Sequence, residues 1–140
     1  MTNANRMWGR IRALAMGALV VGTTLSLSST AQDAKPGVTR VIFEHHDQSG
    51  VEGKEIVTGA VTLSPGAEVA FHIHPGDEAG YVVQGSVIWK VRGQPDRTLR
   101  AGDSFFNPRG SVHSLVGGDT GGREFSAWIV DKGKPLSSPP

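Results

Sequence analysis

GAEVAFHIHPGDEAGYVVQG, residues 66–85, is the stretch that decides the fold. His72 and His74 lie two residues apart, and side chains two apart on a β-strand point to the same side, so both imidazoles can reach one point. A tight Pro-Gly turn follows, and we expect it to reverse the chain and bring Glu78 onto the neighbouring strand. Two imidazole nitrogens and one carboxylate suit Mn²⁺, Fe²⁺, Ni²⁺, Cu²⁺, Co²⁺ or Zn²⁺. The stretch therefore predicts a metal site built on strands.

A second stretch, GDSFFNPRGSVH, ends in a further histidine. Gly102 is followed after five residues by Pro108, and Gly110 is followed after two residues by His113. The spacings of the two stretches resemble the two conserved motifs of the cupin superfamily. The match rests on glycine, proline, histidine and glutamate positions together, which is harder to reach by accident than a lone His-x-His.

The resemblance to cupins covers the chain from about Gly66 to Gly117. Every fixed position of the first motif is matched. The second motif departs once, because the superfamily usually has Asn four residues after the histidine and this chain has Gly117 there. That Asn is not a metal ligand, so the departure concerns local loop packing. The resemblance implies an all-β fold, the double-stranded β-helix (jelly-roll-like) barrel, and leads us to expect a homodimer.

The resemblance also implies one divalent metal ion inside the barrel, with His72, His74, Glu78 and His113 as its ligands. The identity of the metal stays open, because the usual affinity order favours Cu²⁺ and Zn²⁺ over Mn²⁺ and Fe²⁺ whatever the protein prefers. No further histidine, cysteine or acid pair near the motifs offers itself as a general base, so Glu78 is also our candidate for proton transfer.

The rest of the pattern is that of an all-β chain. Between Lys35 and Val130 the apolar residues alternate or come in short runs, without the i, i+3, i+4, i+7 recurrence of an amphipathic helix. Turn residues rich in Gly, Pro and Asp separate the runs. The predicted strands are residues 38–43, 56–63, 68–74, 80–84, 86–91, 104–107, 112–116 and 124–130.

Three segments are expected along the chain. Residues 1–31 read as a secretory signal peptide, since three arginines precede an apolar run and small residues end at Ala31. The barrel domain is expected over residues 35–131, and residues 132–140 carry too little apolar material to order, so we expect a disordered tail. A periplasmic or secreted protein follows, with no membrane association after cleavage.

The charge balance of the mature chain argues against nucleic acid as a partner. After residue 31 the chain has 11 Lys and Arg against 13 Asp and Glu, a net charge of 11 − 13 = −2. Binding to phosphate or to an anionic membrane requires clustered basic residues, which the sequence lacks. Small molecules and a metal ion remain as the expected partners. The absence of cysteine means that the core must suffice without disulfides.

Other side chains allow two interpretations each. His45 and His46 could form an accessory metal site, but adjacent residues on a strand face opposite ways, which favours an exposed loop or edge. Arg109 could meet an anionic substrate or be a solvated turn residue, and Asp77 could support Glu78 or simply form a turn. The aromatic residues could line a substrate pocket, but we expect them in the core or at a dimer interface. They are Phe71, Tyr81, Trp89, Phe105, Phe106 and Trp128.

These features favour a metal-dependent enzyme acting on a small oxygenated substrate. The reaction could be that of a dioxygenase-like oxidoreductase, or of a lyase or isomerase that works through an enolate. The alternative is a non-catalytic periplasmic module that binds or senses a small molecule, because the short region between the motifs, residues 86–101, leaves little structure for specificity. A third interpretation is that the metal only stabilises the barrel.

Overall fold

Residues 35–140, which the computed structural model describes, form seven β-strands and no helix. Every strand pair is antiparallel. The strands are β1 (Val38–Asp47), β2 (Lys54–Leu63), β3 (Glu68–His72), β4 (Gly76–Val91), β5 (Arg97–Arg100), β6 (Ser104–Asn107) and β7 (His113–Asp131). The all-β prediction is confirmed.

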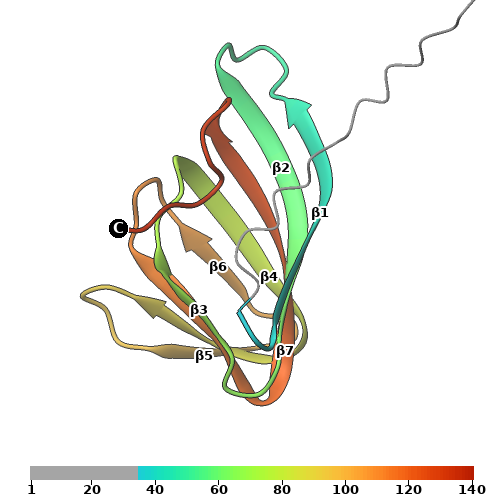
Figure 1. Ribbon diagram of the computed structural model, residues 1–140, viewed down its shortest axis with the longest axis vertical. Helices are drawn as coiled ribbons and strands as arrows, with labels where there is room; N and C mark the ends of the chain where they lie inside the picture. Colours follow the sequence, from blue (N-terminus) through green and yellow to red (C-terminus); the bar gives the residue numbers. More distant parts are fainter. Residues whose placement is uncertain (1–34) are drawn as a thin grey trace, which may run out of the picture. The chain divides into compact units, whose positions relative to one another are not determined.

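Two long strands, β4 and β7, run antiparallel to each other through both halves of the sheet (Figure 1). The C-terminal part of β7 pairs with β2, which pairs with β1, and the N-terminal part of β7 pairs with β3. In β4 the N-terminal part pairs with β6 and the C-terminal part with β5. This is the double-stranded β-helix arrangement that the sequence predicts.

Strand boundaries differ from the prediction where glycine interrupts a strand without ending it. β4 is one strand, although the sequence predicts two around Gly85, and β7 is one strand across residues 117–122. The β4–β7 register shifts at Gly85, so the strands bend there and continue as a β-bulge. Strand β5 is missed by the sequence pattern, because Leu99 is its single apolar residue.

Gly85 lies at a close approach of β4 and β7. Its φ is 65°, and a Cβ atom added there would lie 2.2 Å from the carbonyl oxygen of Gly121. Any other residue would have to adopt a left-handed conformation and push the neighbouring backbone away. The glycine at this position of the first motif is therefore required by the bend of the sheet.

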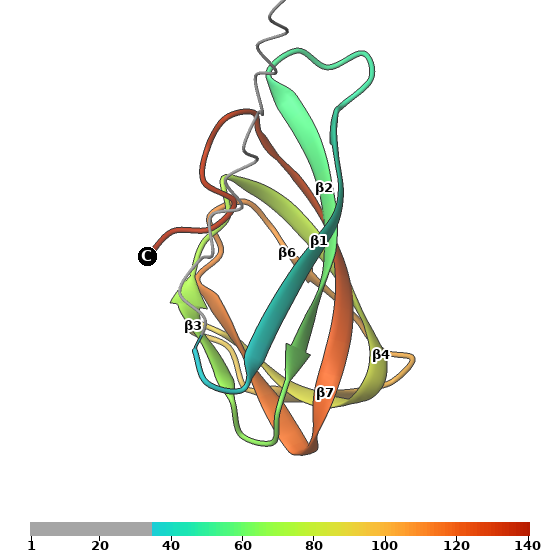
Figure 2. The ribbon, with the colours of Figure 1, turned by 45° about the vertical axis from the view of Figure 1, so that its right-hand side comes forward.

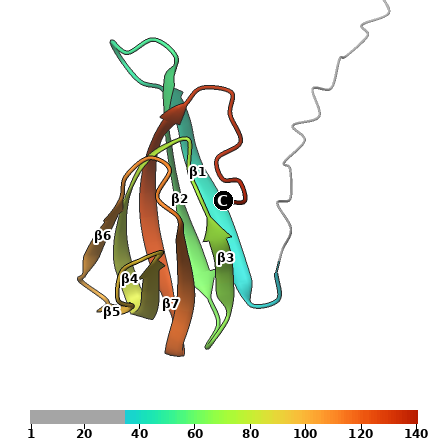
Figure 3. The same ribbon diagram turned by 90° about the vertical axis from the view of Figure 1, so that its left-hand side faces the viewer.

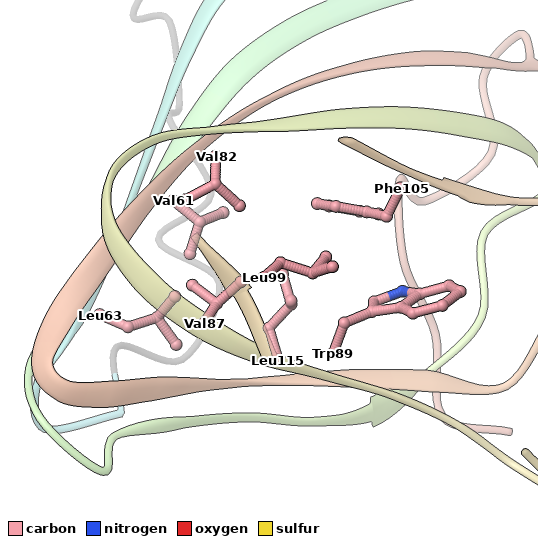
Figure 4. Close-up of a cluster of buried hydrophobic side chains, with 8 residues drawn as sticks. All are labelled: Val61, Leu63, Val82, Val87, Trp89, Leu99, Phe105 and Leu115. Atoms are coloured by element: carbon pink, nitrogen blue, oxygen red, sulfur yellow. The ribbon is translucent and has the colours of Figure 1, made fainter. Parts of the chain in front are cut away.

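The core fills the interior between the two halves of the sheet (Figure 4). Its side chains come from alternate positions of the strands, as expected for a sheet with one buried face. The main cluster is Val61, Leu63, Val82, Val87, Trp89, Leu99, Phe105 and Leu115. A second cluster of Val57, Trp128 and Val130 lies with Leu136 packed against it. The two clusters form the apolar interior, and the polar site described below lies next to them.

The C-terminal segment, residues 132–140, differs from the predicted disordered tail. Leu136 packs against the second core cluster, and the backbone of Ser138 forms a β-bridge with Ile73. One apolar side chain and a few backbone hydrogen bonds hold a segment whose composition alone predicts no order. The predicted signal peptide lies outside the described residues. Among the described residues, no helix is long and apolar enough to cross a membrane.

Candidate metal centre

Four polar side chains converge from three parts of the sheet. His72 ends β3, His74 lies in the link to β4, Glu78 lies on β4, and His113 begins β7. His72 and His113 are paired across the β3–β7 ladder. β3 and β4 both pair with β7 but not with each other, so the chain between them crosses to another part of the barrel instead of forming the hairpin that the Pro-Gly turn predicts.

The three histidine rings form a tight group. Their ligand nitrogens all lie within 4.8 Å of one another. The ring centroids of His72 and His113 are 4.3 Å apart, and those of His72 and His74 are 4.8 Å apart. Glu78 Oε2 lies 3.4 Å from Nε2 of His74 and 3.2 Å from Nε2 of His113. The group could hold a metal ion, and a buried carboxylate lies beside it.

Each histidine is oriented by a backbone carbonyl. The Nδ1 atoms of His72 and His113 lie 2.8 Å from the carbonyl oxygens of Ala70 and Ser111, and Nδ1 of His74 lies 2.6 Å from that of Leu136. A carbonyl oxygen can only accept a hydrogen bond, so Nδ1 carries the proton in all three rings. The Nε2 atoms are left with lone pairs, which is the tautomer that binds metal.

The buried Nε2 atoms of His74 and His113 are better placed to bind a cation than to form hydrogen bonds with each other. Nε2 of His74 and of His113 make no hydrogen bond within residues 35–140, although Glu78 Oε2 lies 3.4 and 3.2 Å away. Buried polar atoms rarely stay unpaired. A divalent cation between these lone pairs and the carboxylate would satisfy all of them at once.

The protonation states suit a metal site as well. Burial, helped by the nearby His113, lowers the pKa of His72 to about 4, so this ring is neutral near pH 7. Burial would raise the pKa of Glu78, but His113 and His74 outweigh it and hold that pKa well below its usual range. The site therefore presents a neutral His72 ring and an ionised Glu78 carboxylate, the forms in which these groups coordinate metals.

A buried polar chain holds Glu78 in place. Trp89 Nε1 donates to Asn107 Oδ1 at 3.1 Å, and Asn107 Nδ2 donates to Glu78 Oε2 at 2.7 Å. The Trp89 contact fixes which end of the Asn107 amide faces the carboxylate. Sequence reasoning misses Asn107, yet its place two residues after Phe105 on one strand is a signal for an inward-facing polar side chain.

The cavity beside the histidines is small and contains two further charged groups. It is lined by Arg40, Val61, Val69, His72, His74, Glu78, His113, Leu115, Glu124 and Trp128. Its volume of about 10 Å³ is room for about one water molecule. Arg40 comes from β1 and Glu124 from β7. Only tertiary structure brings either residue to the site, and sequence reasoning misses both.

Glu124 is completely buried, and Arg40 lines the same cavity. Its Oε2 accepts a hydrogen bond from Ser126 Oγ at 2.6 Å, whereas Oε1 makes none with any described residue. Burial raises the pKa of Glu124 to about 8, since the hydrogen bond from Ser126 only partly offsets the loss of water. A carboxyl group that is protonated near neutral pH therefore lines the cavity.

His45, His46, Arg109 and Asp77 do not line the cavity. His45 contacts Glu55 and His46 contacts Glu44, each at 2.9 Å, on the edge strand β1. Their different partners agree with the expectation of an exposed edge rather than one shared site. Arg109 lies in a turn with its side chain half-exposed, and it forms an ion pair with Asp131.

Arg109 and Asp77 tie together the turns at one end of the barrel. Nη1 of Arg109 donates to the carbonyl oxygen of Pro75 at 2.7 Å, and its backbone N donates to Asp77 Oδ1 at 2.9 Å. Arg109, followed by Lys54, holds the pKa of Asp131 far below its usual range. Both residues thus support the turns around the site, and Asp77 does so without contacting Glu78 through any hydrogen bond found in residues 35–140.

The aromatic residues divide between the core and the outer surface. Trp89, Phe105 and Trp128 are buried as predicted, and Trp128 also lines the cavity. The other three, Phe71, Tyr81 and Phe106, are 40–55% exposed and so do not belong to the core. Alternation along the strands turns these side chains outward, a distinction that composition alone does not reveal.

The departure at Gly117 has a steric explanation. A Cβ atom at Gly117 would lie 2.2 Å from the carbonyl oxygen of Ser64. The backbone N of Gly117 donates to the carbonyl of Ala67 at 2.9 Å, and its carbonyl accepts from the N of Gly66 at 3.0 Å. This close pairing with the β2–β3 turn leaves no space for an asparagine side chain.

Comparisons with known proteins point to one family. Residues 59–122 match the family model described as the cupin domain. An auxin-binding protein of Prunus persica, ABP19b, is 40% identical over 77 residues, which are 51% of this chain and 37% of that protein. The dimethylsulfoniopropionate lyase DddQ of Ruegeria pomeroyi is 30% identical over 79 residues, 56% of this chain and 38% of the lyase. The chain thus spans well under half the length of these curated relatives.

Solved structures resemble the barrel over most of the described residues. KdgF from Halomonas sp. has a TM-score of 0.60 and 27% identity, covering 73% of this chain and 86% of that one. The DddQ structure has a TM-score of 0.62 at 21% identity and covers 74% of this chain and 51% of the lyase. The likeness to KdgF extends over most of the KdgF chain, whereas DddQ contains structure beyond the matched region.

Proposed function

Given that this chain belongs to the cupin superfamily, we propose that it is a metal-dependent enzyme acting on a small oxygenated substrate. One observation carries the proposal: three histidine rings converge beside one ionised carboxylate at a cavity, and two of their buried Nε2 atoms have no hydrogen-bond partner among the described residues. Buried groups of this kind cost free energy until a partner satisfies them.

The metal ligands in this proposal are His72, His74, His113 and Glu78. The metal is a single divalent transition ion (Mn, Fe, Ni, Cu, Co or Zn), because the donor set mixes imidazole nitrogen with a carboxylate oxygen. Such an ion, when bound, supplies Lewis-acid activation of a substrate oxygen. The protein contributes the orientation of the rings through backbone carbonyls and the orientation of Glu78 through Asn107.

Arg40 and Glu124 define the substrate side of the site. Arg40 brings a positive charge to the cavity wall, which favours a substrate with a carboxylate or enolate oxygen. Glu124 presents a buried oxygen without a hydrogen-bond partner among the described residues and with a raised pKa, so it is suited to donate or accept a proton near neutral pH. Glu78 stays a candidate for proton transfer, but its low pKa makes it the weaker base.

The similar proteins favour a lyase or isomerase reaction over a dioxygenase reaction. The similar protein DddQ is a lyase that acts on dimethylsulfoniopropionate. An elimination through an enolate needs a proton acceptor beside the polarised oxygen, and Glu124 lies in the right cavity for that task. The small cavity restricts the substrate to a few atoms or requires the barrel mouth to open.

The experiment is a metal-dependent activity assay. Protein loaded separately with each of the six metals is offered a panel of enolisable acids, phenols, sugar acids and dimethylsulfoniopropionate. We expect turnover with at least one metal, loss of that turnover on chelation or in His74→Ala, and retention in His46→Ala, whose exposed ring lies against Glu44 away from the cavity. Absence of turnover with all metals across the panel would count against an enzyme.

The second candidate is a non-catalytic module that binds or senses a small molecule. It is favoured by the 40% identity to an auxin-binding protein and by the small cavity. Ligand affinity that survives exchange of the metal for a redox-inert ion, with no product formed, would support it. If instead His72→Ala lowers thermal stability without changing any ligand binding or activity, the metal only stabilises the barrel.

We also propose that the protein is exported to the periplasm or beyond, and that it forms a homodimer. Export rests on the sequence of residues 1–31. The dimer rests on an apolar outer face of the half-sheet β1-β2-β7-β4-β6. Exposed side chains on this face include Val41, Phe43, Phe106, Phe125 and Tyr81. Exposed apolar patches of this kind commonly mark protein interfaces.

A further inference from the structure

The C-terminal segment returns to the metal centre after β7 ends. Lys132 N donates to the carbonyl of Gly53 at 2.9 Å, and Lys132 Nζ forms an ion pair with Asp47 at 2.6 Å. From there the chain turns back, and its end lies beside the end of β3 (Figures 2 and 3). The segment therefore runs from the β1–β2 hairpin to the strand that carries His72.

Two anchors hold this segment against the barrel. Ile73 N donates to the carbonyl of Ser138 at 3.0 Å, and Ser138 N donates to the carbonyl of Ile73 at 3.1 Å. The side chain of Leu136 packs against the core cluster of Val57, Trp128 and Val130. Leu136 is therefore held in both directions along the chain, by the end of β7 before it and by the Ser138 bridge after it. Its own carbonyl is directed inward.

That carbonyl accepts a hydrogen bond from His74 Nδ1 at 2.6 Å. The carbonyls that orient His72 and His113 belong to residues only two positions before each histidine, so these two rings are positioned locally. His74 is different, because its partner is 62 positions away in sequence. Among the three rings, only His74 depends on a distant segment for its tautomer.

We propose that residues 135–138 are a positioning segment that sets the tautomer and orientation of His74, so that metal affinity depends on docking of this segment. The metal part of this inference rests on the proposed function. The tautomer part does not, because the Leu136 carbonyl keeps the proton on Nδ1 whether or not a metal is bound. Groups that orient metal-binding histidines typically change metal affinity 10–100-fold when removed.

The primary test compares two deletions. A variant lacking residues 136–140 loses the Leu136 carbonyl and the Ser138 bridge, whereas a variant lacking residues 139–140 keeps both. Long-range ¹H–¹⁵N NMR of the metal-free proteins, at about pH 8 where histidine is neutral, reports the tautomer of each ring. We expect the longer deletion to shift His74 toward the Nε2–H form while His72 and His113 keep Nδ1–H, and the shorter deletion to change nothing.

A metal titration provides the second readout. Competition between the protein and a chelator for Zn²⁺ should show about a 10-fold weaker affinity for the longer deletion, with the shorter deletion equal to the intact chain. Leu136→Ala, which weakens the packing but keeps the carbonyl, serves if the longer deletion does not fold, and we expect a smaller change in the same direction.

The outcomes separate the two proposals. An unchanged His74 tautomer in both the longer deletion and Leu136→Ala would overturn the positioning role, whatever the metal result. If the longer deletion shifts the His74 tautomer as expected but the intact protein binds none of the six metals, the result would support the positioning of His74 and contradict the metal-dependent function. Equal Zn²⁺ affinity of all variants, despite a shifted tautomer, would overturn the link between docking and affinity.

Discussion

Two buried glutamates line one cavity, and their surroundings move their pKa values in opposite directions. Glu78 faces two histidines and accepts a hydrogen bond from Asn107, and its pKa is held well below the usual range despite burial. Glu124 has burial as its dominant influence, and its pKa rises to about 8. Such a pair divides the roles, with one carboxylate suited to hold a cation and the other to move a proton.

The raised pKa of Glu124 predicts a pH-dependent cost of folding in the metal-free protein. Below pH 4.5 both the folded and unfolded chains keep this proton. Between pH 4.5 and about 8 the unfolded chain ionises while the folded chain stays protonated, so the free energy of unfolding falls as pH rises. Above about pH 8 both forms are ionised and the fall stops.

Glu124→Gln should remove this effect. We expect its free energy of unfolding, measured by urea denaturation and compared with the unmodified protein at each pH, to gain steadily from pH 4.5 to about 8 and then to level off. The gain is on the order of 1.4 kcal/mol per unit of pKa shift at most. His72 titrates near pH 4 in both proteins, so it cancels in the comparison. A constant difference between the two proteins would show that Glu124 is ionised normally.

At the scale of the strands, the two long elements β4 and β7 decide the shape of the site. Each strand bends instead of ending, so its two parts pair with different strands. In β7 the C-terminal part pairs with β2 in the outer half-sheet, and the N-terminal part begins at His113 and pairs with β3. Glu78 and the core residue Val87 thereby lie on the same strand, β4, and His113 and Glu124 both lie on β7. The bend depends on the close approach at Gly85.

Replacement of Gly85 by alanine tests this dependence. The new Cβ would be strained at φ 65° and would meet the Gly121 carbonyl, so we expect a loss of about 3 kcal/mol in the free energy of unfolding. Gly93→Ala is the matched control, because Gly93 has a φ of 82° but no atom within 4 Å of the added Cβ. The control should lose only about 1 kcal/mol. Equal losses in chemical denaturation would mean that the approach of the strands is easily relaxed.

At the scale of the whole molecule, one row of apolar side chains crosses the outer half-sheet. Val41, Ala60, Phe125 and Tyr81 are cross-strand neighbours on β1, β2, β7 and β4. Phe43 stacks on Phe125 with ring centroids 6.2 Å apart. The row is continuous and turned away from the core, which makes it the face that the proposed homodimer would cover.

A charge in the middle of this row should separate the dimer. Phe125→Glu places a carboxylate where a partner would have to desolvate it, so we expect a monomer in sedimentation analysis at concentrations where the unmodified protein is dimeric. Val51→Glu is the control, since Val51 is similarly exposed but lies in the β1–β2 turn. A monomeric unmodified protein, or a Phe125→Glu variant that stays dimeric, would contradict this interface.

The sequence by itself determined those features that depend on local spacing. Alternation along a strand places His72 beside His74, and the glycine and proline spacings of the two motifs imply the barrel, which the structure confirms. The same local signals misread Gly85 as the end of a strand and missed β5, because a bend and a short polar strand depend on what lies across the sheet.

Only the tertiary structure decided which other side chains share the site. Glu124, Arg40 and Asn107 are far from the first motif in sequence, and no spacing rule relates them to it. The same holds for Leu136, whose carbonyl meets His74 across 62 positions of chain, in a segment whose composition predicts disorder. The physical reason is that burial and hydrogen bonding belong to pairs of groups, and the partner of a buried group is chosen by how the strands pair.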